Sequence, residues 1–222
     1  MSELLPLFPL GTVLYPGLLL PLHIFEDRYR QLVGDLLAGP EPREFGVIAI
    51  RQGRETGVDG VSALYEIGCI AALRQVTEHD DGRFDLMTVG TQRFRLLDLD
   101  ESQPYLQGRI DLLAEDSGDE AATAVAAQSV QVAFRAYLDA LATQGSVRVS
   151  VPDLPDEPVL LSYLVASSVI VDLTERQLLL AEPDALLRLT AERALLAKET
   201  RILRSLSSTP APDLRNRPYS PN

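Results

Sequence analysis

The side chains that could act as general bases are few. The chain holds two histidines, His23 and His79, and one lysine, Lys198. A Ser-His-Asp triad needs one of the histidines as its base, but His79 stands in an acidic segment typical of a solvated turn, and His23 stands in an apolar run typical of a strand, where a buried or rim position is expected. A peptidase that activates serine with lysine needs Lys198, which the sequence Leu-Ala-Lys-Glu predicts on the solvated face of a helix. These residues therefore indicate no catalytic set.

Phosphate-binding and metal-binding patterns are equally weak. A P-loop needs a glycine-rich turn followed by Gly-Lys-Ser/Thr, and the only lysine has no glycine near it. His79, Asp80 and Asp81 offer oxygen and nitrogen ligands in a row, yet nothing supplies a further ligand at a defined spacing. The single cysteine, Cys69, excludes an internal disulfide, and its apolar neighbours in GCIAAL favour a small buried residue over a reactive thiol. We expect no metal and no cofactor.

The charge balance argues against nucleic acid as a general partner. The chain carries a formal net charge of -12, whereas phosphate neutralisation needs a basic surface. One local pattern points the other way, because Arg93 and Arg95 flank Phe94 in the manner of a base-stacking element. No other basic residues alternate with aromatic ones, and this weakens an RNA-binding interpretation.

The apolar N-terminal stretch 4–25 predicts buried strands and turns. Its first positive charge is Arg28, so no basic segment precedes it as in a signal peptide. Prolines such as Pro6, Pro9 and Pro16 interrupt it too often for a membrane helix, which needs about 20 apolar residues with every backbone group satisfied. We expect no membrane contact and a cytoplasmic protein.

The residues up to about 115 predict strands and one helix. The helix is expected over Asp27–Leu37, with an ion pair between Glu26 and Arg30 one turn apart. Asp-Gly at Asp81-Gly82 predicts a hairpin. Its strands are 68–78 and 83–90, other strands are expected at 45–51, 93–99 and 105–113, and a mobile loop at 51–62.

The residues after about 115 predict helices. The first is expected over 119–144, opened by a capping box at Ser117–Glu120. Its inward residues are expected to be Val125, Val132 and Ala136 or Tyr137. Pro158 suits the first turn of the second helix, which runs to about Val169. A capping box at 174–177 opens a third helix, and 184–206 forms the last, with Leu189, Leu196 and Leu203 on its packed face. The tail 207–222 is rich in proline and poor in apolar residues, which predicts disorder.

Two blocks carry a family resemblance. The segment 4–33, with its element FEDRYRQLV, and the segment 65–97, with its hairpin and the element GTQRFR, resemble the N-terminal substrate-recognition domain of Lon proteases. The order of the helices, including SYLVASSVIVDLTERQLLL, is similar to the second half of that domain. The resemblance implies an α+β protein: a PUA-like twisted, partly closed β-barrel with one helix over 1–115, a helical bundle over 116–206, and the tail.

The resemblance also implies a function. The ATPase and peptidase parts of Lon have no counterpart here, so we expect a non-catalytic polypeptide-binding module rather than an enzyme, with an adaptor role in proteolysis or protein quality control. Fold analogy alone does not establish this. The alternatives are a peptidase or hydrolase with an unrecognised site and an RNA-binding PUA-like protein.

The candidate binding residues lie in an apolar turn. Tyr15, Pro16 and Leu18, with Phe25 or Arg93 nearby, are expected to help form a groove for unfolded or extended polypeptide. The partners expected are such polypeptides, with a protease or a chaperone as a further candidate. The competing interpretation is that the turn only packs the core.

Overall fold

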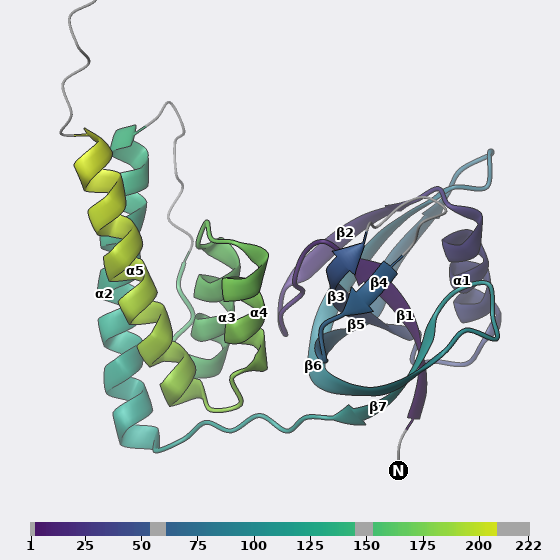
Figure 1. Ribbon diagram of the computed structural model, residues 1–222, viewed down its shortest axis with the longest axis horizontal. Helices are drawn as coiled ribbons and strands as arrows, with labels where there is room; N and C mark the ends of the chain where they lie inside the picture. Colours follow the sequence, from purple (N-terminus) through teal and green to yellow (C-terminus); the bar gives the residue numbers. More distant parts are fainter. Residues whose placement is uncertain (1–2, 54–60, 145–152, 208–222) are drawn as a thin grey trace, which may run out of the picture.

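A computed structural model describes residues 3–53, 61–144 and 153–207. Its strands are β1 (Glu3–Leu10), β2 (Leu19–Ile24), β3 (Glu44–Gly53), β4 (Val61–Leu64), β5 (Ile67–Glu78), β6 (Phe84–Asp100) and β7 (Gln107–Leu112). Its helices are α1 (Asp27–Ala38), α2 (Glu120–Gln144), α3 (Pro158–Ser168), α4 (Leu173–Ala181) and α5 (Ala185–Ser207). We call residues 3–112 the strand region and 120–207 the helical region; they lie side by side (Figure 1).

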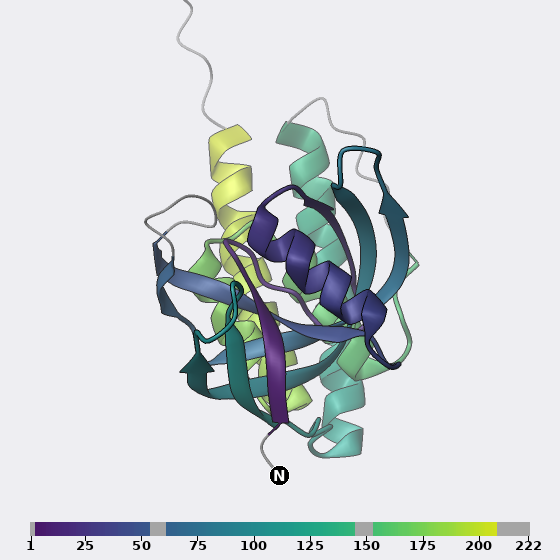
Figure 2. The same cartoon turned by 90° about the vertical axis from the view of Figure 1, so that its right-hand side faces the viewer.

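Strand pairing in the strand region returns to its starting point. The path runs β1-β7-β6-β5-β3, and β3 also pairs in parallel with β1, so each of these five strands pairs with two others of the five. β2 pairs only with β6, and β4 pairs with β3. Helix α1 lies across the strands (Figure 2) and buries Tyr29, Leu32 and Val33 against Phe8 and Phe45.

The predicted hairpin is present, but its second strand is longer than expected. Gly82 adopts a φ of 77°, which favours glycine, and its N–H donates to the carbonyl of His79 at 2.9 Å. The strands expected at 83–90 and 93–99 are one continuous strand, β6, because register shifts in its pairing with β5 absorb the break in the pattern. Gly90 lies inside β6 where an added Cβ would stand 2.2 Å from the carbonyl oxygen of Tyr15.

Two local predictions in the strand region are wrong in detail. Glu26 pairs with Arg28 at 2.9 Å, while Arg30 pairs with Asp27, so the expected Glu26–Arg30 ion pair does not form. The loop expected at 51–62 is shorter, since β3 extends to Gly53 and β4 begins at Val61. Residues 54–60, on which the rest of that prediction falls, lie outside the described residues, as does the tail 208–222.

The helix starts differ from the predicted capping boxes. The carboxylate of Asp119 accepts from the N–H of Ala122 at 2.7 Å, so Asp119 caps α2 in place of Ser117. Asp172 caps α4 in place of Thr174, accepting from the N–H of Glu175 at 2.8 Å. Aspartate accepts with a carboxylate, which favours it over the hydroxyl groups two residues away.

Helix α3 begins as predicted. Pro158 stands in its first turn, and the Glu157 carboxylate caps the turn by accepting from the N–H groups of Val159 and Leu160.

The inward face of α2 is only partly the predicted one, because Tyr137 is buried as expected but Val125 and Val132 are not. Val125 and Val132 are 65% and 68% exposed. The buried positions are Ala127, Val130, Phe134, Tyr137 and Leu138, which pack with Leu161, Val165, Leu189 and Leu196 of α3 and α5. Apolar residues occur on every side of α2, so its own pattern does not select one face. Leu189 and Leu196 lie on the packed face of α5 as predicted.

Candidate functional site

The structure separates the predicted site residues into two groups. Tyr15, Pro16 and Arg93 are buried and Leu18 is partly buried, all on the side of the strand region that meets the helices. Phe25 is 53% exposed and lies elsewhere, stacked near the His23 ring. The five residues do not line one exposed groove, and their role in polypeptide binding stays a prediction.

Tyr15 joins the two regions. Its hydroxyl donates to the carbonyl of Arg176 at 2.9 Å, and its ring lies 6.0 Å from the ring of Tyr163. Burial raises the pKa of the Tyr15 hydroxyl, so it stays a neutral donor. The same cluster contains apolar residues from both regions: Val13, Ala49, Ile67, Ala166, Leu179 and Leu180.

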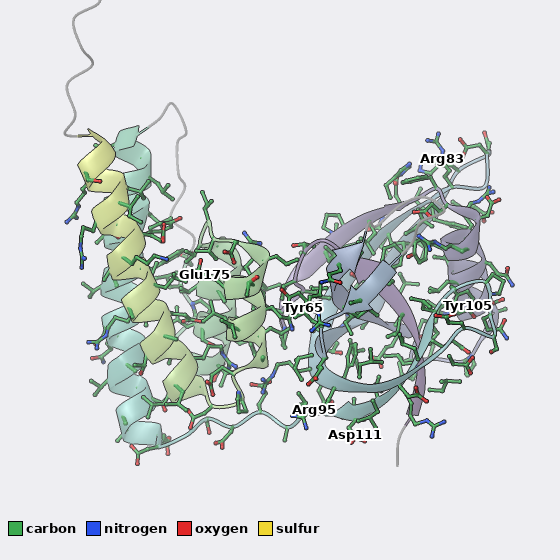
Figure 3. All side chains as sticks on the ribbon, in the orientation of Figure 1. Tyr65, Arg83, Arg95, Tyr105, Asp111 and Glu175 are labelled. Atoms are coloured by element: carbon green, nitrogen blue, oxygen red, sulfur yellow. The ribbon has the colours of Figure 1, made fainter. Side chains whose placement is uncertain are left out.

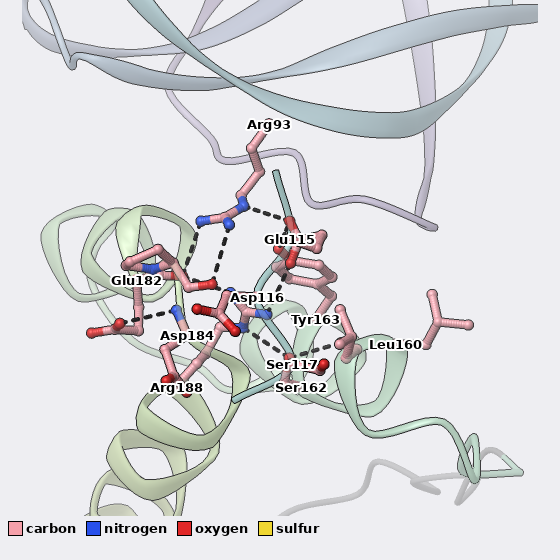
Figure 4. A network of polar contacts seen from close by, with 12 residues as sticks. Arg93, Glu115, Asp116, Ser117, Leu160, Ser162, Tyr163, Glu182, Asp184 and Arg188 are labelled. Carbon is pink, nitrogen blue, oxygen red and sulfur yellow. Dashed lines mark hydrogen bonds and ion pairs between the residues drawn. The ribbon is translucent and has the colours of Figure 1, made fainter. Parts of the chain in front are cut away.

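Arg93 belongs to a buried polar network at this junction (Figure 4). Its Nε donates to Glu115 Oε1 at 2.7 Å, and its Nη1 donates to the carbonyls of Leu180 and Glu182 at 3.0 and 2.9 Å. Arg188 approaches the other carboxylate oxygen of Glu115 at 3.5 Å. One carboxylate thus serves two buried guanidinium groups, which is a structural arrangement and leaves Arg93 no surface for a ligand.

Further contacts lie at the junction, and those of Gln177 and Tyr65 join the two regions. The Tyr163 hydroxyl donates to Glu115 Oε1 at 2.6 Å, and the Arg188 guanidinium lies 4.1 Å over the Tyr163 ring. Gln177 donates from Nε2 to the carbonyl of Ile67 at 2.7 Å. Tyr65 faces the helices (Figure 3), with its hydroxyl 3.3 Å from that of Thr174. The sequence had assigned Gln177 to a capping box, and no local signal indicates its partner 110 residues away.

An exposed sheet face lies away from these contacts. β6 pairs with both β2 and β5, placing Leu19 opposite Val89, Pro21 opposite Met87 and His23 opposite Asp85. Because side chains alternate along a strand, these residues share one face with Gln75 and Thr77 of β5. We call this the β2 face. A hollow of about 360 Å³ lies along it, lined by Pro21, Leu22, His23, Gln75, Thr77, Asp85, Leu86 and Met87.

The outer edge of β2 has no strand beside it in the described chain. The Gly90 N–H donates to the Leu18 carbonyl at 2.8 Å. In an antiparallel ladder every second residue bonds the same neighbour, so Leu20 and Leu22 bond β6, and the backbone groups of Leu19, Pro21 and His23 point outward. Pro21 offers a carbonyl but no N–H. Leu19 beside this edge is 66% exposed.

The β2 face carries a pair of histidines that sequence reasoning missed as a cluster. His23 Nδ1 and His79 Nε2 lie 2.6 and 2.7 Å from the two carboxylate oxygens of Asp85. These hydrogen bonds, from His23 first and His79 second, lower the pKa of Asp85. His23 is exposed rather than in the predicted buried or rim position. The hairpin brings His79 to Asp85, but only the β2–β6 register adds His23, so no local motif could predict all three together.

Nothing in the described residues completes a reactive set there. Neither imidazole has a serine or threonine hydroxyl among its hydrogen-bond partners in the part of the chain described. The described residues also contain no group of three or more His, Cys, Asp or Glu side chains placed to hold a metal ion. Lys198 stands on a solvated helix face as predicted, with Glu175 at 3.1 Å. Cys69 is buried as predicted, and burial raises its pKa.

Fold and junction together define an α+β protein in which a mixed sheet and a set of helices share a core. The chain belongs to the family of the ATP-dependent protease La (LON) substrate-binding domain, whose family model matches residues 4–198. In the described residues no helix has the length and apolarity to cross a membrane.

Curated relatives are much longer proteins. Lon protease 2 of Syntrophobacter fumaroxidans is 25% identical over 187 residues, covering 83% of this chain and 23% of the relative. Lon protease 1 of Herpetosiphon aurantiacus is 27% identical over 212 residues, covering 90% of this chain and 24% of the relative. The chain therefore spans about a quarter of the length of these relatives.

Solved structures share the fold. The Lon N-terminal domain protein from Xanthomonas campestris superposes with a TM-score of 0.59 at 24% identity, covering 88% of this chain and 98% of that one. The N-terminal domain of the Mycobacterium avium complex Lon protease superposes with a TM-score of 0.63 at 16% identity, covering 90% of this chain and 98% of that one.

Proposed function

We propose that this protein binds extended segments of unfolded polypeptide along β2, without catalysis, and presents them as an adaptor in proteolysis or protein quality control. Membership of a substrate-binding domain family supports a polypeptide ligand. The observation that carries the location is the open outer edge of β2 next to exposed apolar side chains. An open edge can accept main-chain hydrogen bonds from any extended chain, whatever its sequence.

The chemistry of the edge suits weak, sequence-tolerant binding. Leu19 and His23 each present an N–H and a carbonyl, and Pro21 presents a carbonyl alone. Leu19 and Phe25 stand at the two ends of β2 as apolar anchors. The missing donor at Pro21 limits uncontrolled pairing with other edges. A flexible client would therefore gain a few main-chain bonds and two apolar contacts.

The predicted turn residues have a supporting role in this proposal. The Gly17 N–H donates to the Gly90 carbonyl at 2.8 Å, directly before β2 begins. Tyr15, Pro16 and Leu18 pack this turn against the helices, and Arg93 holds the helices in place. They position β2, while Phe25 and Leu19 contact the client.

The test compares two leucine variants of similar exposure. Leu19→Asp should weaken binding of a fluorescently labelled, reduced and carboxymethylated lactalbumin by roughly tenfold, since loss of an apolar anchor costs on the order of 1.4 kcal/mol. Leu112→Asp makes the same change on β7, where the leucine is also exposed, and should leave binding unchanged. Circular dichroism and thermal melting check both folds. Equal binding by the two variants would move the site away from β2.

Absence of catalysis is part of the proposal and has its own test. The purified chain should leave casein intact with or without ATP and magnesium. The pair of histidines on Asp85 gives one specific reason to look for a hydrolase instead. Casein cleavage that Asp85→Asn abolishes would favour that second function and would contradict ours.

The finer structural predictions join this proposal. The strand pairing that returns to β1 supports a PUA-like barrel, and the change from strands to helices after Glu115 supports a division there, with the helices as a bundle. We propose a cytoplasmic protein with no nucleic-acid or membrane partner, supported by the net charge of -12. Labelled single-stranded RNA should therefore not compete with the unfolded client.

A further inference from the structure

A second surface lies on the helical region, along the seam between α2 and α5. The two helices run beside each other over most of their length (Figure 1). Two hollows of about 480 and 420 Å³ follow one another along this seam. The first is lined by Ala121, Ala122, Val125, Ala126, Ser129, Leu189, Thr190 and Arg193. The second is lined by Ala133, Ala136, Leu196, Ala197, Thr200, Arg201 and Arg204.

The seam has an apolar floor, and exposed apolar side chains of α2 lie beside it. Leu189 and Leu196 are themselves buried and form its floor with alanine methyl groups. Val125 and Val132 project beside it from α2, seven residues apart and therefore on one side of that helix. Such a face costs solubility when it has no partner, and it resembles the packed side of a helix pair.

The charges along the seam are of one sign. Arg193, Arg201 and Arg204 line it, all three are exposed, and none forms an ion pair in the described chain. No acidic side chain lines either hollow. In a chain of net charge -12, three arginines thus gather on one apolar surface without an ion pair in the described residues. This positive charge is complementary to an acidic partner.

We propose that the α2–α5 seam docks an acidic amphipathic helix of a partner protein. The stripe from Thr190 to Arg204 is about 21 Å long at 1.5 Å per residue, which is about four helical turns. An incoming helix would lay its leucine side on the alanine and leucine floor and place glutamates against the arginines. Charged rims of this kind set orientation and speed the encounter.

Other occupants fit the seam less well. Two copies of this face would bring three arginines against three arginines, which opposes self-association. A nucleic acid would find the positive charge, but the seam offers no aromatic side chain for base stacking. Charge complementarity with an apolar floor therefore favours an acidic helix over both.

The test uses a designed peptide of about 18 residues with leucines at helical spacing and glutamates on either side. Fluorescence anisotropy at low and at physiological salt should show binding to the intact chain. The triple variant Arg193→Glu, Arg201→Glu, Arg204→Glu should weaken binding by at least tenfold. A matched control, Arg51→Glu, Arg95→Glu, Arg109→Glu, makes the same charge change at exposed arginines of the strand region and should bind nearly as the parent does.

Several results would overturn the proposal. Equal loss in both triple variants would show only a response to net charge, and tighter binding of single-stranded RNA than of the peptide would indicate a nucleic-acid site. Dimerisation by light scattering that the seam variant abolishes would assign the seam to a second copy. If the glutamate variant does not fold, the corresponding Arg→Gln triple, which removes charge without reversing it, serves instead. An unchanged affinity in that variant would also contradict us.

Discussion

At the scale of single residues, burial decides what Arg93 does. Its position beside Phe94 and near the apolar turn indicated a binding residue, yet five protein oxygens surround its guanidinium within 3.5 Å. A guanidinium removed from water needs such partners. Sequence alone could not show this, because four of those oxygens are backbone carbonyls whose position depends on the chain path.

Removal of Glu115 tests the network. Glu115→Ala leaves Arg93 and Arg188 buried without a counter-ion, so we expect the free energy of unfolding to fall by about 3 kcal/mol. Lys198→Ala breaks an exposed pair with Glu175 and should cost less than about 1 kcal/mol. Urea unfolding measures both. Similar small losses would mean that water enters the junction and screens the charges.

Glu192 is a buried carboxyl group that the sequence did not single out. It is fully buried on α5, and neither carboxylate oxygen has a hydrogen-bond partner in the described structure. Desolvation raises its pKa well above the ordinary 4.5, and Arg188 opposes this only in part. The folded protein therefore holds Glu192 protonated at a pH where the unfolded chain releases the proton.

The sign of the pH effect follows from this shift. A carboxyl with a raised folded-state pKa makes the folded state bind more protons, so stability falls as pH rises above about 4.5 towards that pKa. The slope reaches at most about 1.4 kcal/mol per pH unit. Glu192→Gln should match the parent near pH 4 and exceed it in stability at pH 7. Glu101→Gln, at an exposed position, should show no such divergence. Parallel curves for parent and Glu192→Gln would refute the assignment.

At the scale of elements, local signals predicted whether a segment is helix or strand better than they predicted which of its faces is buried. The hairpin turn, α1 and the start of α3 followed from glycine, apolar spacing and proline, each of which acts within one turn of chain. The face of α2 depends on which helices cover it. Its alanine-rich sequence is compatible with several orientations, so Val125 and Val132 were assigned inward and lie outside.

The revised helix caps give a direct test. Asp172→Ala removes the acceptor for the N–H of Glu175 and should lower the free energy of unfolding by about 1 kcal/mol. Thr174→Ala, which the predicted capping box would make equally costly, should change it by less than about 0.5 kcal/mol. Chemical denaturation of the two variants decides between the caps. Tyr65→Phe removes the contact between the Tyr65 and Thr174 hydroxyls alone and serves as the control. A loss for Thr174→Ala that exceeds those of both Asp172→Ala and Tyr65→Phe would restore the predicted box.

At the scale of the whole molecule, the family and the order of the elements could be predicted from the chain, but the individual long-range pairings could not. The parallel pairing of Leu7–Leu10 with Gly46–Ala49 joins segments separated by α1. The contact of Gln177 with Ile67 spans 110 residues. Contacts of this range leave no periodic trace. The exposed β2 edge and the particular contacts of the junction therefore had to come from the structure, although packing of the helices on the strand region was predicted.

The last prediction concerns the dependence of the two regions on each other. Tyr15, Ala49 and Ile67 of the strand region share one buried cluster with Tyr163 and Leu180 of the helical region. Separate production of residues 1–115 and 116–222 would expose these side chains to water, at about 25 cal/mol for each Å² of apolar surface. We expect each fragment to aggregate or to melt at lower temperature than the whole chain. Mixing the fragments should restore one cooperative transition, because the junction is non-covalent. Two soluble, monomeric fragments as stable as the intact protein would show that the regions are independent domains.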